Sequence, residues 1–485
     1  MSNSSNKQSK YRYLAGNIAL FSVSNFVSKI LVFLLVPLYT NVLTTYEYGI
    51  ADILQVTILL LVPALTANMG EAALRFGIEK NQQRGSILRI GLKFIIRSDV
   101  FVTAICLLLM LFMGGDIRQY ILYFVFLYIT NSLYEYLILY FQGCEMVPVV
   151  VIGSVFSTLV MILSNILFLL VIKIGLRGYI LSQVLAYAFA SAIMLIIGKM
   201  GRDKLMGQED KALEKEMVSY GLPMIAYSTG SWINNAADRY IVAGICGSAA
   251  NGVYGVAYKI PAILTVFQRI FAQAWQMSAT KSYTDEKSDE FFTTMYKVYN
   301  TFMVMGCALL ILFVRLIAAF LFKKEFYEAW RFVPPLLISV IFGALTGFLG
   351  SICLAHKDSK SMGLATGIGA AINIVLNLIT VPFYGAMGAA WATAVSYFTM
   401  CIMAYIFVRR HVRLGNDLKK ELAGYIIVTL EAVIMIMGFR LCYLLCLIIC
   451  LVLSLIYYRD IKEICLKLLG LVRGKIKKDS SHEQM

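Results

Sequence analysis

Residues 48–51 read YGIA, and residues 254–257 read YGVA, at an offset of 206 positions. A second pair of similar segments, GLRG at 175–178 and GAMG at 385–388, has an offset of 210, and a tyrosine follows each segment nine residues later. Two offsets that differ by only four residues predict two homologous halves of six helices each. Because six is even, both halves enter a membrane in the same direction, as in transporters that bind substrate between two lobes.

The composition supports a membrane protein. Of 485 residues, 60% are hydrophobic and 15% are charged, whereas soluble domains have about 25% charged residues. The mean hydropathy is +0.76, and no polar block is long enough to form a soluble catalytic domain on a membrane anchor. Most of the ten cysteines lie in apolar segments without ligand partners, so we expect neither disulfides nor a metal site.

A bilayer core about 30 Å thick requires about 20 helical residues per crossing, and the sequence contains fourteen segments of this kind. The predicted spans are 14–39, 49–69, 89–113, 119–141, 147–172, 178–199, 217–246, 252–277, 296–322, 330–354, 361–383, 386–408, 420–439 and 441–458. They group into an N-terminal lobe (1–199), a cytoplasmic linker (200–216), a C-terminal lobe (217–408), two accessory helices (409–458) and a basic tail (459–485).

The distribution of basic residues predicts the orientation of these spans. With both termini in the cytoplasm, 31 of the 43 Lys and Arg residues fall on the cytoplasmic side and seven on the outside. Such an excess is the usual signature of cytoplasmic loops. The net charge of +15 therefore indicates membrane topology, and no nucleic-acid partner is expected.

The predicted seventh span carries an unusual run of polar residues. These residues share one helical face by their spacing: Tyr227, Ser231, Asn234, Asn235 and Asp238. Polar groups inside a membrane span mark an aqueous path or a packing partner. We therefore predict that this face lines a central cavity, with hydrogen bonding between packed helices as the alternative.

The first span carries a matching polar run. Subtraction of the 206-residue offset places the seventh-span polar positions on Asn25, Ser28 and Lys29. Equivalent helices with equivalent polar faces are expected if both line one cavity between the lobes.

Basic residues outnumber acidic ones inside the first twelve spans. The basic residues are Lys29, Arg239, Lys259, Arg269 and Arg315, and the acidic ones considered as counter-charges are Glu135 and Asp238. A cationic cavity suits a phosphate group, which Lys and Arg bind through charge-assisted hydrogen bonds. The sequence leaves three alternatives open: Arg239 pairs with a nearby carboxylate, Lys259 and Arg269 extend to the membrane interfaces, or the two acids titrate in an ion-coupled cycle.

No residue pattern indicates catalysis. The three histidines lie in predicted loops or the tail, and no glycine-rich phosphate loop is present. We therefore expect no enzyme activity, no catalytic residue and no cofactor.

Residues in both halves resemble a known family. They are Asn17, Ser24, Asn25, Lys29, Pro37, Leu43 and the step Glu47-Tyr48-Gly49 in the first half, with Gly221-Leu222-Pro223, Asp238-Arg239, Gly252 and Tyr254 in the second. This pattern resembles the repeat-unit flippases of O-antigen, capsule and exopolysaccharide synthesis, which belong to the multidrug/oligosaccharidyl-lipid/polysaccharide (MOP) superfamily.

The resemblance implies a fold and a function. The fold would be two six-helix lobes in the V shape of multidrug and toxic compound extrusion (MATE) transporters, plus two C-terminal helices. The function would be movement of an undecaprenyl-pyrophosphate-linked oligosaccharide across the bacterial cytoplasmic membrane by alternating access, with basic residues of the cavity at the pyrophosphate. Membrane lipids, a polysaccharide polymerase and glycosyltransferases would be its partners, and the chain would act as a monomer. The alternatives are a peptidoglycan-precursor flippase and a cation-coupled multidrug exporter.

Overall fold

The computed structural model describes residues 31, 33–79, 83–199, 207–282, 288–356, 358–438 and 440–462. Within these ranges the chain is helical and forms no β-strand. The described residues divide into two compact units, one ending at Gly252 and also including Leu321–Phe326, the other formed by Val253–Phe320 and the residues from Tyr327 onward.

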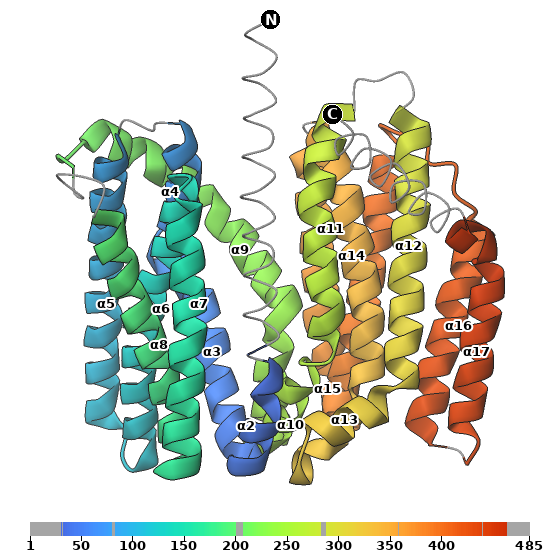
Figure 1. The fold of residues 1–485 in the computed structure, drawn as a ribbon, viewed down its shortest axis with the longest axis horizontal. Coiled ribbons are helices and arrows are strands. Elements are labelled where there is room, and N and C mark those ends of the chain that lie inside the picture. The colour runs from blue at the N-terminus through green and yellow to red at the C-terminus, as the bar shows by residue number, and fades with distance from the viewer. Residues whose placement is uncertain are drawn as a thin grey trace, which may run out of the picture. The chain divides into compact units, whose positions relative to one another are not determined.

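The first unit is a bundle of helices (Figure 1). Its elements are α2 (Val36–Val42), α3 (Thr45–Leu65), α4 (Met69–Glu79), α5 (Arg84–Phe112), α6 (Asp116–Gly143), α7 (Val147–Asn165), the π-helical turn η2 (Ile166–Val171), α8 (Gly175–Lys199) and α9 (Lys211–Cys246). The boundary between the units falls inside α10 (Ser248–Ala257).

The second unit continues with a second set of packed helices. Its elements are α11 (Pro261–Ser282), α12 (Ser288–Leu312), α13 (Val314–Leu321), the 3₁₀ turn η3 (Lys324–Arg331), α14 (Val333–Ala355), α15 (Ser359–Val408), α16 (Leu418–Met437) and α17 (Cys442–Ile456). The last residue of α13 and the first three residues of η3 belong to the first unit. In Figure 1, α16 and α17 lie side by side, and both pack on α12.

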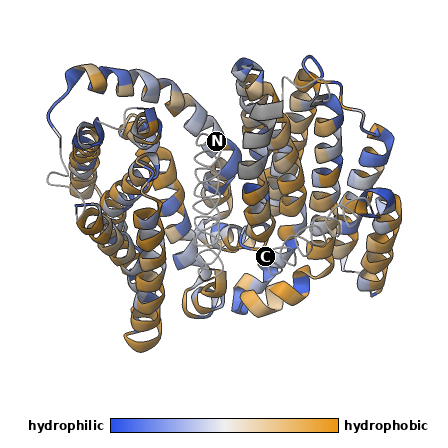
Figure 2. Ribbon diagram, turned by 45° about the horizontal axis from the view of Figure 1, so that its top comes forward, coloured by the Kyte–Doolittle hydropathy of each residue, from blue (hydrophilic) through white to orange (hydrophobic). Residues whose placement is uncertain are grey.

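Eight helices in the described ranges are long and apolar enough to cross a membrane. Two shorter apolar helices, Pro261–Ala272 and Cys442–Ile456, accompany them. Figure 2 shows hydrophobic residues along most helices, with hydrophilic residues gathered at helix ends and connections. The prediction of an all-helical, multi-pass membrane protein is therefore confirmed, whereas the count of fourteen spans stays a prediction.

Helix boundaries follow from local chemistry. α3 begins with a capping box, in which the Thr44 backbone N–H donates to Glu47 and the Glu47 N–H donates to the Thr44 hydroxyl, at 2.9 and 3.2 Å. The predicted break between the eleventh and twelfth spans falls inside α15, where Gly385 has a φ of 57°. This left-handed conformation suits a residue without a Cβ atom.

The repeated YG step lies at a very close helix crossing. A Cβ atom on Gly49 of α3 would lie 1.8 Å from the backbone oxygen of Ser248, and one on Gly252 would lie 1.9 Å from that of Thr45. Only glycine leaves room for the α3 and α10 backbones to approach this closely. In this copy of the repeat, the motif therefore has a packing role.

The core of each unit is apolar and rich in aromatic side chains. In the first unit the buried Tyr136 and Tyr140 hydroxyls of α6 donate to α5 backbone carbonyls of Ile87 and Arg84, at 2.9 and 3.1 Å. In the second unit Trp275 of α11 stacks on Phe348 of α14 with ring centroids 4.1 Å apart. These packed cores place the helices on which the predicted site residues lie.

The compact units do not follow the repeat boundaries. α9, the predicted first helix of the C-terminal lobe, packs on α3 and α4 in the first unit. The predicted lobes (1–199 and 217–408) rest on sequence similarity between halves, and that division stays a prediction.

Candidate functional site

The polar face of the first span lies outside the described residues. Asn25, Ser28 and Lys29 all precede the first described position. Their alignment with the polar face of α9 stays a prediction from the repeat.

Burial divides the polar face of α9. Asn234 and Asp238 are buried, while Tyr227 and Asn235 are exposed and Ser231 is half-buried. Successive residues on a helix are about 100° apart, so the adjacent Asn234 and Asn235 cannot meet the same surroundings. The predicted common face is therefore divided into a buried part and an accessible part.

A buried ion pair links α9 to α3. The Nη1 atom of Arg239 lies 2.7 Å from Oδ1 of Asp52, and the two side chains are 15% and 7% exposed. Asn251 of α10 donates to the other carboxylate oxygen of Asp52 at 3.3 Å and to the Gly49 carbonyl at 3.2 Å. Arg239 therefore pairs with a nearby carboxylate, which is the alternative that the sequence left open.

Asp238 has a different role from its neighbour. Its Oδ1 atom accepts the backbone N–H of Arg239 at 2.9 Å, so this buried carboxylate is held by its own helix. The sequence analysis considered Asp238 as a counter-charge, and in the structure Arg239 forms its ion pair with Asp52. The position of Asp52, three residues after the Gly49 crossing, is the signal that could have identified it.

Further aromatic and polar side chains of α9 lie between Tyr227 and Tyr240. Tyr227 is 63% exposed, and the partly exposed Tyr240 shares a short hydrogen bond with Thr57 of α3. Trp232 donates from Nε1 to the Val56 carbonyl at 2.7 Å, and its ring meets that of Tyr240 edge to face at 5.6 Å. Tyr227, Asn235 and Tyr240 are exposed and Ser231 and Trp232 are half-buried, and we call these five residues of α9 the α9 polar surface.

Two predicted basic residues lie early in the second unit. Lys259, after α10, is half-buried, and Arg269 of α11 is exposed. Neither forms an ion pair with another residue in the described ranges. Both therefore retain charge that an anionic ligand could neutralise.

Arg315 of α13 packs against the accessory helices. Its Nη2 atom donates to the Met435 carbonyl of α16 at 3.0 Å, and its guanidinium carbon lies 4.2 Å from the centroid of the Trp330 ring. These contacts place it at the C-terminal end of α16. Its predicted role at the cargo stays a prediction.

Glu135 of α6 is exposed on the first unit. The neighbouring Tyr134 stacks on Tyr187 of α8 with ring centroids 5.0 Å apart. Nearby, Gln55 of α3 donates to Tyr179 and Gln183 of α8, at 3.2 and 3.1 Å. Gln55 therefore connects α3 to α8, and Tyr134 connects α6 to α8. Of the residues in this region, the sequence analysis had named only Glu135.

Sequence reasoning also missed a buried polar cluster in α15. Asn373 donates to the hydroxyls of Thr393 and Ser396 at 3.4 and 3.3 Å, and Asn377 donates to the Asn373 side chain at 3.1 Å. These contacts join the two arms of α15 across the Gly385 break. The spacing of Asn373 and Asn377, one helical turn apart, was the available signal.

No cluster of three or more His, Cys, Asp or Glu side chains that could hold a metal ion occurs among the described residues. The polar groups described on α9 and α3 are amides, hydroxyls, aromatic rings, the Arg239 guanidinium and the carboxylates of Asp52 and Asp238. Such groups bind sugars and phosphates by hydrogen bonding and charge.

Known structures share this fold. A lipid II flippase MurJ in an inward closed conformation matches with a TM-score of 0.67 and 16% identity, covering 91% of this chain and 99% of that one. An inward-facing multidrug resistance MATE family transporter of the MOP superfamily matches with a TM-score of 0.66 and 13% identity, covering 79% and 94%. A MOP superfamily transporter from Pyrococcus furiosus matches with a TM-score of 0.58 and 12% identity, covering 81% and 95%. The fold is therefore that of MOP superfamily transporters.

Sequence comparison adds family membership. An uncharacterized membrane protein of Methanocaldococcus jannaschii is 23% identical over 262 residues, which span 50% of this chain and 62% of that relative. The profile of the family described as polysaccharide biosynthesis protein matches residues 14–276. Since this match covers more than half of the sequence, the chain belongs to the polysaccharide biosynthesis protein family.

Proposed function

We propose that this protein moves an undecaprenyl-pyrophosphate-linked oligosaccharide repeat unit from the inner to the outer leaflet of the bacterial cytoplasmic membrane by alternating access, for surface polysaccharide assembly. The observation that carries the proposal is the α9 polar surface, where exposed aromatic, hydroxyl and amide groups lie on a helix of a membrane protein. The family match supports the link to polysaccharide synthesis.

The physical need for such a protein is clear. A glycan-pyrophosphate headgroup cannot cross hydrocarbon unaided, because its charges and hydroxyls would lose their hydration at a cost of many kcal/mol. A polar cavity replaces that hydration, while the isoprenoid tail stays in the bilayer. Two lobes that rock about a midplane site expose the cavity to each side in turn.

Each predicted site residue is assigned a proposed role that matches the chemistry of its side chain. Lys29, Lys259 and Arg269 are proposed to hold the pyrophosphate, because the last two have no acidic partner within the described ranges. The tyrosine rings and amides of the α9 polar surface suit the faces and hydroxyls of sugars. Asp238 and Glu135 remain proposed as counter-charges or ion-coupling groups, and Arg239 is proposed to shape the cavity through its pair with Asp52.

Orientation and partners follow from the same proposal. Both termini would lie in the cytoplasm, where glycosyltransferases complete the lipid-linked unit. A polymerase on the outer side would then consume it.

A lipid-linked peptidoglycan precursor is the second candidate cargo. The lipid II flippase MurJ fold covers 91% of this chain, compared with 79% for the inward-facing MATE transporter. Both candidate cargoes are isoprenoid-linked pyrophosphates, so the α9 polar surface suits either. A cation-coupled drug exporter is favoured less, because basic groups outnumber acidic ones at the predicted cavity positions.

The test is translocation in proteoliposomes. Purified protein is supplied with a fluorescent undecaprenyl-pyrophosphate oligosaccharide, and movement is followed with a membrane-impermeant quencher. The double variant Tyr227→Ala/Asn235→Ala should slow translocation by at least about tenfold, because several contacts worth about 1 kcal/mol each are lost.

The control variant is Tyr458→Ala, which removes an exposed tyrosine of the second unit and should leave the rate unchanged. Parallel assays with lipid II and with a cationic dye separate the three candidate cargoes. Translocation of lipid II but not of the oligosaccharide lipid would reject the repeat-unit assignment, and equal rates for wild type and the double variant would reject the α9 polar surface.

A further inference from the structure

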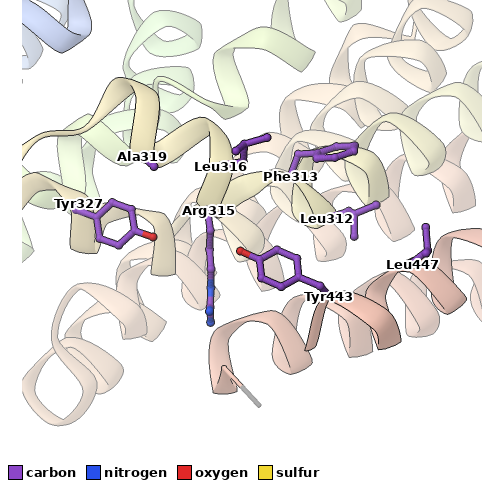
Figure 3. A pocket seen from close by; sticks show the side chains of 8 residues that line it. All are labelled: Leu312, Phe313, Arg315, Leu316, Ala319, Tyr327, Tyr443 and Leu447. Atoms are coloured by element: carbon purple, nitrogen blue, oxygen red, sulfur yellow. The ribbon is translucent and has the colours of Figure 1, made fainter. Parts of the chain in front are cut away.

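A pocket of about 580 Å³ opens on the second unit between α13 and α17 (Figure 3). Its volume lies within the range of ligand-binding pockets, about 300 to 1,000 Å³. Its lining consists of Leu312, Phe313, Arg315, Leu316, Ala319, Tyr327, Tyr443 and Leu447. One positively charged side chain therefore lies in a mostly apolar pocket.

The guanidinium of Arg315 has hydrogen-bonding capacity to spare. It has five N–H donors; Nη2 donates to the Met435 carbonyl, and the buried Nε has no hydrogen-bond partner. No Asp or Glu pairs with Arg315 within the part of the chain that the structure describes. A cation next to apolar walls without a counter-charge favours an anionic ligand.

Two tyrosines complete the polar end of the pocket. In Figure 3, Tyr327 and Tyr443 lie on either side of Arg315 with their hydroxyl groups directed toward it. The Tyr443 ring centroid is 5.9 Å from the guanidinium carbon. Phenol hydroxyls donate to phosphate oxygens, so these groups together could surround a phosphate.

The other end of the pocket is hydrophobic and accessible. Leu316 is 67% exposed, and Phe313 and Leu447 are also exposed. In a chain that spans a bilayer, exposed leucines on such helices contact lipid acyl chains. A ligand of this pocket therefore needs an anionic headgroup and a hydrocarbon tail.

We propose that this pocket, which we call the Arg315 pocket, binds the phosphate of an anionic glycerophospholipid of the surrounding bilayer, such as phosphatidylglycerol. Charge complementarity identifies this occupant, because a phosphodiester matches the guanidinium while the first acyl carbons match Phe313, Leu316 and Leu447. The bound lipid would connect α13 to the α16–α17 pair through Tyr443 and the end of α16. This inference does not depend on the identity of the transported cargo.

Native mass spectrometry of the full chain in detergent tests the proposal. Dioleoylphosphatidylglycerol and dioleoylphosphatidylcholine are titrated separately, and bound lipid is counted for wild type, Arg315→Gln and Leu447→Trp. Wild type should bind phosphatidylglycerol at least about tenfold more tightly than phosphatidylcholine, because the choline ammonium beside the phosphate of phosphatidylcholine offsets its attraction to the guanidinium. Arg315→Gln should abolish this preference, and Leu447→Trp, which fills the apolar end, should weaken binding of both lipids.

The matched control is Arg331→Gln, which removes an exposed arginine paired with Glu328 at 3.0 Å and should leave the preference unchanged. Circular dichroism and gel-filtration profiles identify variants that have lost their fold, and Leu447→Trp remains informative if Arg315→Gln does not fold. Equal binding of the two lipids by wild type, or an unchanged preference in Arg315→Gln, would overturn the proposal. Displacement of phosphatidylglycerol by an equimolar amount of undecaprenyl phosphate would also overturn it, because the site would then belong to the isoprenoid cargo.

Discussion

Two arginines predicted at the cavity are stabilised in opposite ways. Arg239 in the first unit pairs with Asp52 at 2.7 Å. Arg315 in the second unit has a carbonyl and an indole ring as neighbours, and no carboxylate pairs with it within the described ranges. The sequence predicted both as phosphate ligands and left open, for Arg239, a pair with a nearby carboxylate. The comparison shows that the charge of Arg239 is already neutralised, whereas that of Arg315 is available.

The packing of the backbone near the two arginines also differs, because it is tight beside Arg239 and looser beside Arg315. Beside Arg239, α3 and α10 meet at the Gly49 crossing, where nothing larger than hydrogen fits. Beside Arg315, Gly438 ends α16 in a left-handed conformation, and a Cβ there would meet only the flexible Nη2 atom at 2.9 Å. The first region is therefore rigidly determined, and the second can adjust.

Breaking the Asp52–Arg239 pair is expected to have the largest effect. Arg239→Ala leaves a buried carboxylate without its counter-charge and should lower the free energy of unfolding by about 3 kcal/mol. The double variant Asp52→Asn/Arg239→Gln removes both charges and should recover most of this loss. Denaturant unfolding in micelles measures both, and equal losses for the two variants would show that the ion pair is not the cause.

Filling the Gly49 crossing is expected to have the next effect. Gly49→Ala places a methyl group 1.8 Å from the Ser248 oxygen, so the two helices must separate, at a cost of about 2 to 3 kcal/mol. Gly244→Ala is the matched control, because nothing lies within 4 Å of its Cβ position. The control should be neutral or slightly stabilising, and an equal loss in both variants would contradict a steric cause.

A side chain at Gly438, at the end of α16, is expected to cost less than one at the Gly49 crossing. Gly438→Ala forces a side chain into a φ of 68°, which costs about 1 to 2 kcal/mol. Gly438→Asn should cost less, because asparagine tolerates this conformation better. The order glycine, asparagine, alanine in melting temperature checks the prediction, and a larger loss than that of Gly49→Ala would reverse the comparison.

A partly exposed hydrogen bond between His411 and Asp358 should have the smallest effect. His411 Nε2 lies 3.0 Å from Asp358 Oδ2, and the Ser361 backbone N–H donates to Oδ1 at 3.2 Å. The hydrogen bond from His411, with that from Ser361, lowers the pKa of Asp358 from its ordinary value of 3.8 to about 2. Asp358→Asn should change the melting temperature by less than about 2 °C at pH 7.

The pH dependence of this pair has a defined sign. A carboxyl group whose pKa is lowered by folding stabilises the fold above its ordinary pKa and loses that contribution as the pH falls through about 2. The difference between wild type and Asp358→Asn should therefore shrink as the pH falls from about 4 to about 2. His411→Gln should move this loss to higher pH, and a difference that persists at pH 2 would exclude the carboxylate as its source.

The correct sequence predictions were those that depend on local pattern. Hydrophobic segments gave the all-helical membrane fold, and the GAMG segment marked the break at Gly385. Periodicity also identified α9 as an unusually polar helix. Periodicity alone could not predict that Asn234 is buried and Asn235 exposed, because burial depends on which neighbouring helix covers each position.

The apolarity of successive segments, which is a property of the sequence itself, thus predicted correctly that the chain is a polytopic membrane protein built from helices. Charge partners came only from tertiary packing, since Asp52 lies far from Arg239 in sequence, pairs with it in the structure and also accepts a hydrogen bond from Asn251. The same holds for Arg315, whose surroundings depend on the docking of α16 and α17. The physical reason is that hydrophobic burial is a property of each segment, whereas electrostatic pairing acts over a few ångströms and needs the final positions of side chains.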